Sequence, residues 1–298
     1  MCIFVFDLPG AANRIRQNFD FDWQFRLGEN GDFREVQLPH DWSVELDFDE
    51  KAGGASGYLP GGIGWYRKSF MIPASYKNQK VSLVFDGIYH KATIFLNGKE
   101  IAYHRYGYTS FETDLTPFLK YGESNDLKIK VDHSEISRWY TGSGIYRHVW
   151  LQVTNPVHVK MWGTYVTTPE ITESQATVKI VTTIENSMEL PTTVIVQQRL
   201  LDGDGKIVKA EGKEVMARTT LKLDKEKTAE VVQNLLVSQG DIVNTMGDMQ
   251  QPLRKMYDRL RNISTTSQSL GEQLDDVRED MAWLIQNNAQ FQVQTTTI

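Results

Sequence analysis

Three short segments of this 298-residue chain combine aromatic rings, glycines and charged groups in a way that suits carbohydrate binding. A sugar presents C–H faces, which pack on aromatic rings, and hydroxyls, which bond to charged or amide groups. The segments are residues 38–42, 57–68 and 137–147, and their Trp, Tyr, Arg and Asp residues supply both kinds of contact. We therefore expect a sugar-binding surface, although for any single Trp or Tyr a place in the core of a large β-sandwich is the commoner role.

Other side chains that could do chemistry lack the spacing that metal binding or phosphate binding requires. The six histidines include no His-x-x-x-His pair, and a single cysteine, Cys2, forms neither an internal disulfide nor a cysteine-based zinc site. The glycine pairs at 53–54 and 61–62 are not followed by Gly-Lys-Ser/Thr, so they are not phosphate loops. An acidic cluster at 47–50 could bind a cation, but a solvated loop is the commoner role. We expect no cofactor and no metal.

Charge and hydropathy restrict the partners and the location. The 32 basic and 38 acidic residues give a net charge of -6, the wrong sign for binding phosphates or an anionic membrane. No run of about 18 apolar residues could span a bilayer, and the apolar opening at 3–6 is shorter than that of an export signal. We expect no nucleic-acid partner, no membrane partner and a cytoplasmic location by default. An export signal lost before residue 1 would leave the same pattern and keep the periplasm open.

Residues 19–237 have the pattern of β structure. In 125–132 apolar residues alternate with polar ones, which is the period of a strand with one buried face. Asn97-Gly98 lies between two apolar runs and predicts a type I′ hairpin, because both turn positions must accept positive φ. A second hairpin turn is predicted at 202–205. Several short strands without helical periodicity predict β-sandwiches.

The β region is too long for one ordinary sandwich. A break at Pro156 fits the composition, because proline cannot donate to a sheet ladder and tends to lie at a boundary. We place one aromatic-rich β domain at 1–155 and a second at 156–238. The second has roughly the length of an immunoglobulin-like module.

Beyond Gln239 the pattern changes to that of a helix. Mostly apolar residues from Ile242 to Leu284 follow alternating spacings of four and three, a heptad seam of about six repeats. This predicts a coiled-coil helix and tail over 239–298 and self-association through 242–291. The residue types along the seam favour trimers or tetramers over dimers. The alternative is a single amphipathic helix folded back on the β domains.

Taken together, the three aromatic-rich segments resemble the N-terminal region of glycoside hydrolase family 2, the β-galactosidase and β-glucuronidase family. The resemblance continues in order through 85–88, 94–98, 107–116 and 162–169, and it covers about residues 13–238. The chain looks most like the β-galactosidase-like enzymes of gut bacteria. The resemblance implies that the first domain is a jelly-roll sugar-binding domain and that the second is an immunoglobulin-like sandwich.

In that family a third domain, a (β/α)8 barrel, carries the chemistry, and its acid/base is the Glu of an Asn-Glu pair. No Asn-Glu dipeptide occurs in this sequence, and the residues after 238 are too few for a barrel of about 250 residues. The resemblance therefore implies that the chain contains no catalytic residue and that the chain alone turns over no glycoside. Loops of the family's first domain reach the barrel's active site. The loop residues that match are Arg138, Trp139 and Tyr140, with Asp41 a weaker candidate, and a weakly bound β-linked sugar is the expected partner.

Three hypotheses for the function follow. The leading one is a non-catalytic N-terminal portion of a β-galactosidase-like hydrolase joined to an oligomerising helix. The second is a multivalent carbohydrate-binding protein, because a helix that gathers weak sites can raise apparent affinity by about 10² to 10⁴. The third is a coiled-coil scaffold that carries the β domains. In each case the immunoglobulin-like domain is expected to be incomplete, and the loss of a final strand leaves an open sheet edge.

Overall fold

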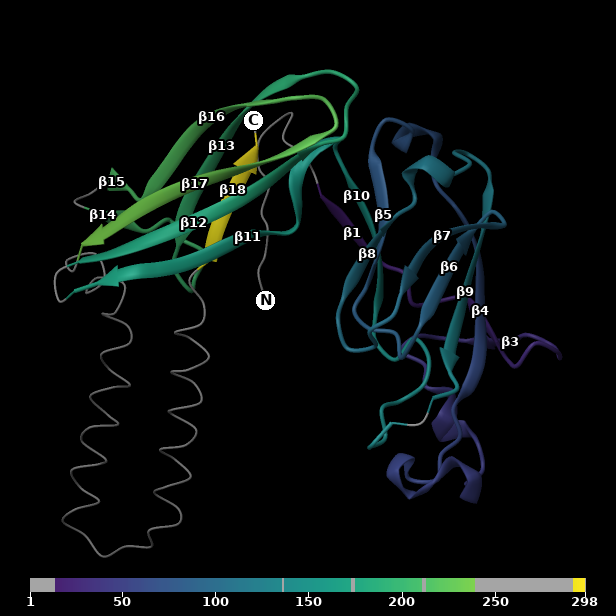
Figure 1. The fold of residues 1–298 in the computed structure, drawn as a ribbon. Helices are drawn as coiled ribbons and strands as arrows, with labels where there is room; N and C mark the ends of the chain where they lie inside the picture. The colour runs from purple at the N-terminus through teal and green to yellow at the C-terminus, as the bar shows by residue number, and fades with distance from the viewer. Residues whose placement is uncertain (1–13, 136, 173–174, 211–212, 239–291, 298) are drawn as a thin grey trace, which may run out of the picture. The chain divides into compact units, whose positions relative to one another are not determined.

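The computed structural model describes residues 14–135, 137–172, 175–210, 213–238 and 292–297. These residues form β-strands joined by loops and a few one-turn 3-10 helices, so the mainly β prediction is confirmed (Figure 1). No helix within them is long and apolar enough to cross a lipid bilayer. The chain divides into two compact units, one spanning Asn13–Pro156 and one whose β structure starts at Val157.

The first unit consists of two antiparallel sheets. Its strands are β1 (Ile15–Asn18), β2 (Trp23–Leu27), β3 (Arg34–Val36), β4 (Gly62–Met71), β5 (Lys80–Phe85), β6 (Ala92–Leu96), β7 (Lys99–His104), β8 (Phe111–Asp114), β9 (Ser124–His133) and β10 (Val149–Thr154). Its 3-10 helices are η1 (Trp42–Glu45), η2 (Glu50–Ala52), η3 (Gly54–Ser56), η4 (Ala74–Tyr76) and η5 (Thr116–Phe118). One sheet has the order β1-β10-β5-β8 and the other has the order β3-β2-β4-β9-β6-β7.

The core of the first unit lies between these two sheets. Leu127, Ile129 and Val131 of β9 are fully buried, which confirms the alternation predicted from the sequence. The hairpin between β6 and β7 is confirmed as well, because Asn97 and Gly98 have φ of 52° and 83°. Short-range signals in the sequence thus correctly located both a strand face and a turn.

Several rings of the aromatic-rich segments belong to this core. Trp42 and Tyr66 are buried, and Phe25 stacks on Trp42 with ring centroids 5.5 Å apart. Burial of rings of this size dominates the energetics of a core, and truncating one to Ala typically costs about 3–5 kcal/mol. These two residues therefore stabilise the sandwich and offer no face to a sugar.

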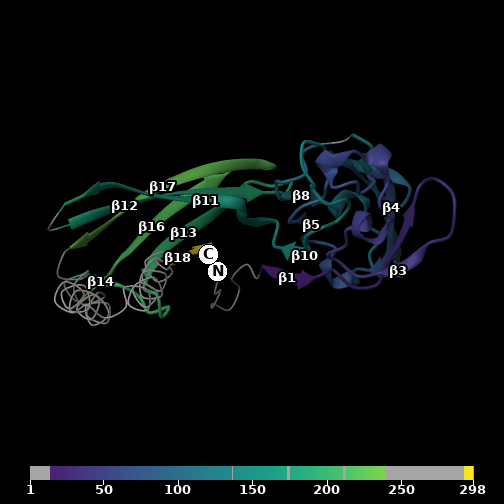
Figure 2. The same ribbon diagram turned by 90° about the horizontal axis from the view of Figure 1, so that it is seen from below.

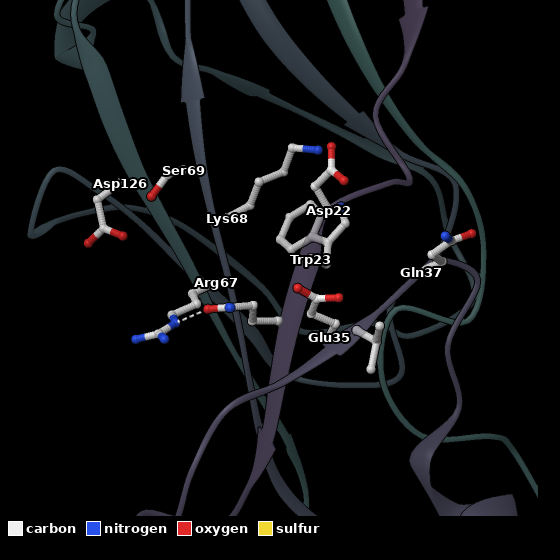
Figure 3. A pocket seen from close by; sticks show the side chains of 10 residues that line it. Asp22, Trp23, Glu35, Gln37, Arg67, Lys68, Ser69 and Asp126 are labelled. Carbon is white, nitrogen blue, oxygen red and sulfur yellow. Dashed lines mark hydrogen bonds between the residues drawn. The ribbon is translucent and has the colours of Figure 1, made fainter.

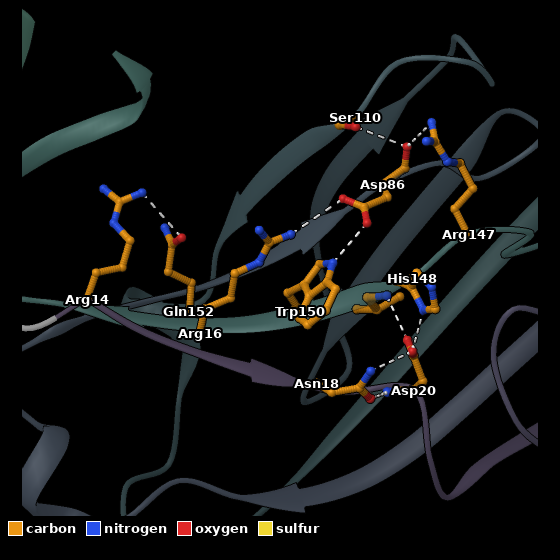
Figure 4. Close-up of polar contacts among 11 residues, drawn as sticks. Arg14, Arg16, Asn18, Asp20, Asp86, Ser110, Arg147, His148, Trp150 and Gln152 are labelled. Atoms are coloured by element: carbon orange, nitrogen blue, oxygen red, sulfur yellow. Dashed lines mark hydrogen bonds and ion pairs between the residues drawn. The ribbon is translucent and has the colours of Figure 1, made fainter. Parts of the chain in front are cut away.

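Polar contacts tie β1 to β10, where the chain enters and leaves the first unit (Figure 4). The buried carboxylate of Asp20 lies 2.7 Å from the Nδ1 of His148. Asp86 accepts a hydrogen bond from the Nε1 of Trp150 at 2.9 Å and forms an ion pair with Arg16 at 3.7 Å. The Arg16 guanidinium also lies over the Trp150 ring, 4.2 Å from its centroid. Because Arg16 lies in β1 and Trp150 lies in β10, these contacts join the two ends of the unit.

The second unit is a smaller sandwich. Its strands are β11 (Val157–Ile171), β12 (Gln175–Asn186), β13 (Thr192–Leu201), β14 (Lys209–Ala210), β15 (Lys213–Glu214), β16 (Met216–Leu223), β17 (Lys227–Ser238) and β18 (Gln292–Thr297). The orders β11-β12-β17 and β16-β13-β18 define two three-stranded sheets, and β14 pairs with β15. Figure 2 shows these strands from a second direction. Buried clusters that combine residues of β12, β13 and β17 show that the two sheets pack on each other.

The C-terminal predictions have different outcomes. The seam and the self-association of 242–291 lie outside the described residues, so they stay predictions. The prediction of a coiled-coil helix and tail over 239–298 needs a correction at residues 292–297. These residues form strand β18, which is antiparallel to β13. This strand was not identified from the sequence, because its pairing partner lies about a hundred residues away and is available only in the folded sheet.

The turn predicted at 202–205 is confirmed by the bridge between Leu201 and Ile207.

Candidate sugar-binding site

Asp41 lies where two loops of the first unit meet. Its carboxylate accepts hydrogen bonds from the backbone N–H of Ser43 at 3.1 Å, from the backbone N–H of Ser143 at 2.8 Å and from the hydroxyl of Tyr140. A carboxylate offers about four acceptor positions. Three are used here, which leaves one for a further donor such as a sugar hydroxyl.

Tyr140 is held in place by the same carboxylate. Partial burial, followed by the hydrogen bond to Asp41 and the negative charge of Asp41, raises the pKa of the Tyr140 hydroxyl. The hydroxyl therefore keeps its proton and continues to donate to Asp41. Gly142, two residues further along the loop, has φ of 76°, and a Cβ there would lie 3.1 Å from Oδ2 of Asp41. Glycine is thus required at this point of the loop.

Trp139, the residue before Tyr140 in the same loop, has an exposed ring. The side chain is 58% exposed, and its Nε1 donates to the hydroxyl of Tyr108 at 3.0 Å, which fixes the indole by its edge. Tyr108 packs edge-on against Tyr106, which is 61% exposed, with ring centroids 5.7 Å apart. The rings of Trp139, Tyr108 and Tyr106 are thus linked in one aromatic group.

Trp139, Tyr140 and Asp41 were predicted from the sequence as site residues. The structure joins Tyr140 to Asp41 by a hydrogen bond, and it bonds the exposed Trp139 to Tyr108. Tyr106 and Tyr108 were missed, although the Tyr-Gly-Tyr of 106–108 has the same aromatic and glycine composition as the three chosen segments. Arg138 is exposed, and it forms no hydrogen bond or ion pair with another residue that the structure describes. Its guanidinium is therefore not held against Asp41.

A chain of hydrogen bonds joins the two loops to each other and to their neighbours. The hydroxyl of Ser43 donates to the carbonyl of Pro60 at 2.6 Å, because a carbonyl only accepts. The Ser143 hydroxyl must then donate to Ser43, and the Nδ1 of His133, 2.6 Å from Ser143, must donate to Ser143. Burial first, and then the neighbouring His90, lower the pKa of His133 to about 4. At neutral pH the His133 ring is therefore uncharged, with its proton on Nδ1.

Close backbone packing fixes the loop that carries Ser143. Gly144 has φ of 107°, and a Cβ there would lie 2.2 Å from the hydroxyl oxygen of the buried Tyr66 and 3.0 Å from the carbonyl oxygen of His40. Only glycine fits this combination of conformation and space. The glycines of the third aromatic-rich segment thus position the donors that hold Asp41.

A cavity of about 640 Å³ lies elsewhere on the first unit (Figure 3). Its lining combines acidic residues such as Asp22 and Glu35 with the cations of Arg67 and Lys68. The dashed line in Figure 3 marks the hydrogen bond of 2.6 Å from Arg67 to Gln24. The tryptophan in this lining is fully buried, so the cavity offers no indole face to a sugar.

The acidic cluster at 47–50 has a local structural role. The carboxylate of Asp49 accepts from the backbone N–H of Lys51 at 2.9 Å and caps η2. Within the described ranges, no three His, Cys, Asp or Glu side chains are grouped so that they could hold a metal ion. Asp49 thus serves as the N-cap of a short helix.

Fold and site define a class: a protein of two β-sandwiches whose first unit has a fixed carboxylate and exposed aromatic rings on its loops. Residues 57–156 match the family described as glycosyl hydrolases family 2, sugar binding domain. The chain is 42% identical over 248 residues to "Beta-galactosidase BoGH2A" of Bacteroides ovatus, an alignment covering 78% of this chain and 28% of that protein. It is 27% identical to a "Beta-glucuronidase" of Formosa agariphila, covering 75% of this chain and 26% of that one.

A solved structure agrees with these relatives. The crystal structure of a glycosyl hydrolase family 2 member from Bacteroides cellulosilyticus superposes with a TM-score of 0.67 at 36% identity, covering 75% of this chain and 31% of that one. The chain spans about a quarter of the length of the curated relatives. It belongs to glycoside hydrolase family 2 as an N-terminal region of that family, which confirms the resemblance found in the sequence.

Proposed function

We propose that this chain is a non-catalytic N-terminal portion of a β-galactosidase-like glycoside hydrolase and that its first unit contributes a contact surface for a β-linked sugar. One observation carries the proposal: the Asp41 carboxylate, fixed by three donors, lies in the same pair of loops as the exposed ring of Trp139. The same two loops therefore carry a hydroxyl acceptor and a platform for C–H faces. Membership of the family supports the choice of ligand class.

Each residue has a distinct part in this proposal. Asp41 accepts from a sugar hydroxyl at its remaining acceptor position, and Trp139 stacks on the face of the ring. Tyr140 acts through Asp41 and is a positioning residue. Arg138, exposed in the same loop, donates to hydroxyls at the periphery. Retaining hydrolysis needs two carboxylates about 5–5.5 Å apart, one of them an acid/base, and in this proposal such a pair is supplied from outside residues 1–298.

Titration calorimetry with a methyl β-galactoside tests this surface. We expect weak binding to the full chain and a reduction of about tenfold, equivalent to about 1.4 kcal/mol, in Trp139→Ala. Trp162→Ala is the matched control, because Trp162 is 59% exposed but lies in the second unit. Binding that Trp139→Ala leaves unchanged would contradict the proposal.

Hydrolysis provides a separate test of the non-catalytic part. We expect the purified chain to release no nitrophenol from nitrophenyl β-galactoside or nitrophenyl β-glucuronide. The physical reason is that the sequence holds no Asn-Glu pair to act as the family's acid/base. Measurable turnover that survives repeated purification would overturn this assignment.

Two further expectations belong to the same proposal. Self-association through 242–291 would gather several sugar surfaces in one particle, and light scattering that shows a monomer would remove it. A cytoplasmic location is the second expectation. Fractionation of expressing cells tests it, and recovery from the periplasm would contradict it.

A further inference from the structure

Strand β18 covers a sheet edge of the second unit. Its six residues pair antiparallel with β13, from Val196 opposite Thr297 to Leu201 opposite Gln292. The other side of β13 is paired with β16, so β13 is central only because β18 is present (Figure 1). Without β18, the backbone N–H and C=O groups on this side of β13 would form an open edge, which readily pairs with another strand.

β18 is not joined to this sheet by a tight turn. The preceding strand, β17, ends at Ser238 in the other sheet, and residues 239–291 separate it from Gln292. A hairpin loop therefore does not impose the pairing. The pairing must therefore be determined by the contacts between β18 and β13.

The composition of residues 292–297 suits strand addition. The segment reads Gln-Val-Gln-Thr-Thr-Thr, without charge, proline or glycine, and four of its residues are β-branched. Three alternate residues of β13, all buried, are opposed by a Val or a Thr; the pairs are Leu200 with Val293, Gln198 with Thr295 and Val196 with Thr297. A slip of one residue would exchange every position between the two faces, so this register is specified.

We propose that the edge of β13 is a peptide-binding site of the strand-addition kind, and that residues 292–297 of the same chain are the ligand that it holds. The ligand class is an extended, uncharged, antiparallel segment rich in Val and Thr. Main-chain hydrogen bonds supply the affinity, and the register of alternate residues supplies the specificity. Occupancy in the same chain closes the edge to strands of other molecules.

Two neighbouring proline variants of the full chain test the site. Consecutive N–H groups of a strand point to opposite sides, so one of Thr295 and Thr296 donates to β13 and the other points to solvent. Proline is tolerated on an edge strand only where the N–H faces solvent. We therefore expect one of Thr295→Pro and Thr296→Pro to detach β18 and the other to be nearly silent. Hydrogen exchange of the β13 amides should become at least tenfold faster in the detached variant, with β12 as the internal control for folding.

The detached variant then serves to measure the site directly. A fluorescent peptide of residues 290–298 should bind it saturably, and it should bind the wild-type chain at least tenfold more weakly because that edge is occupied. The same peptide with Val293→Lys should lose binding, because it carries a charge opposite the buried Leu200. Equal behaviour of the two proline variants, or equal peptide binding to the variant and the wild type, would overturn the proposal. A wild-type dimer that loses β13 protection on dilution would also overturn it, because a second copy would then supply the strand.

Discussion

At the scale of single residues, the candidate site depends on a carboxylate that other groups hold in place. Asp41 receives two backbone N–H groups and one hydroxyl, and these donors come from residues 2, 99 and 102 positions away along the chain. Hydrogen bonds to a charged acceptor are worth about 1.5–3 kcal/mol each. These hydrogen bonds therefore offset the conformational entropy lost in ordering the two loops, and they do so before any sugar binds.

The same site makes the stability of the first unit depend on pH through His133. Burial lowers its pKa to about 4 in the folded chain, whereas an unfolded histidine has a value near 6.5. Between these values the unfolded chain binds a proton that the folded chain does not, so protonation favours unfolding. The contribution of the neutral ring is complete above pH 6.5 and falls as the pH drops toward 4. Urea denaturation should show a loss of about 2 kcal/mol across this window, a figure reduced for solvent screening.

A His133→Gln variant is the control for this pH dependence. Burial lowers the pKa of His40 as well, so the wild-type slope contains more than one contribution. The difference in slope between wild type and variant isolates His133. Identical slopes between pH 6.5 and 4 would show that the ring does not stay neutral in the folded chain.

At the scale of elements, two glycines with positive φ allow the cost of backbone strain to be compared with the cost of a steric clash. Gly98 in the β6–β7 turn has φ of 83° and open space where a Cβ would lie, whereas a Cβ at Gly144 would meet the hydroxyl oxygen of Tyr66 at 2.2 Å. We expect Gly98→Ala to lower the free energy of unfolding by about 1 kcal/mol through strain alone. Gly144→Ala should cost about 3 kcal/mol or more, because the buried Tyr66 ring must shift. Urea denaturation of both variants checks this, and equal losses would contradict it.

The second unit contains a polar pair at the centre of its sandwich. Thr182 of β12 and Gln198 of β13 are fully buried, and the Nε2 of Gln198 donates to the hydroxyl of Thr182. The Oε1 of Gln198 is buried and has no hydrogen-bond partner among the described residues. An unpaired buried polar atom costs about 1–3 kcal/mol, so this pair lowers the stability of the unit.

Replacing both members of this pair tests that interpretation. We expect Thr182→Val with Gln198→Leu to raise the free energy of unfolding of the second unit by about 1 kcal/mol, because two desolvated polar groups become apolar contacts. Thr182→Val alone should lower it, since the amide of Gln198 then loses its partner. Thermal unfolding of the three variants measures both effects. A double variant less stable than Thr182→Val would contradict this interpretation.

At the scale of the whole molecule, the first unit contains everything that its fold requires. Its buried cluster extends from Phe19 to Val153, and among the strands that the structure describes β1 to β10 pair only with one another. We expect the fragment 13–156 to fold alone, with near-ultraviolet circular dichroism of a packed aromatic core and cooperative thermal unfolding. A fragment ending at residue 145 is the control. It lacks β10, which lies between β1 and β5, and it should not fold.

Much of the architecture could be predicted from the sequence because the signals for it are local. The alternation in β9 and the Asn97-Gly98 turn each depend on neighbouring residues, since strand period and turn φ are properties of the backbone at that point. The dense order of motifs over residues 13–238 likewise indicated the family. Asp41, Trp139 and Tyr140 stay predicted site residues, and the structure shows that the two loops that carry them meet.

Only the tertiary structure decided which rings are core and which are surface. Trp42, Tyr66 and Trp139 lie in segments of similar composition, yet the first two are buried and the third is exposed. The proton position on His133 and the pairing of β18 also depend on partners far away in sequence. Composition and periodicity along the chain indicated strands and turns of this protein, and the resemblance of its motifs indicated the family. Burial, hydrogen-bond direction and edge pairing were decided by contacts between distant segments, because those contacts exist only after the sheets have formed.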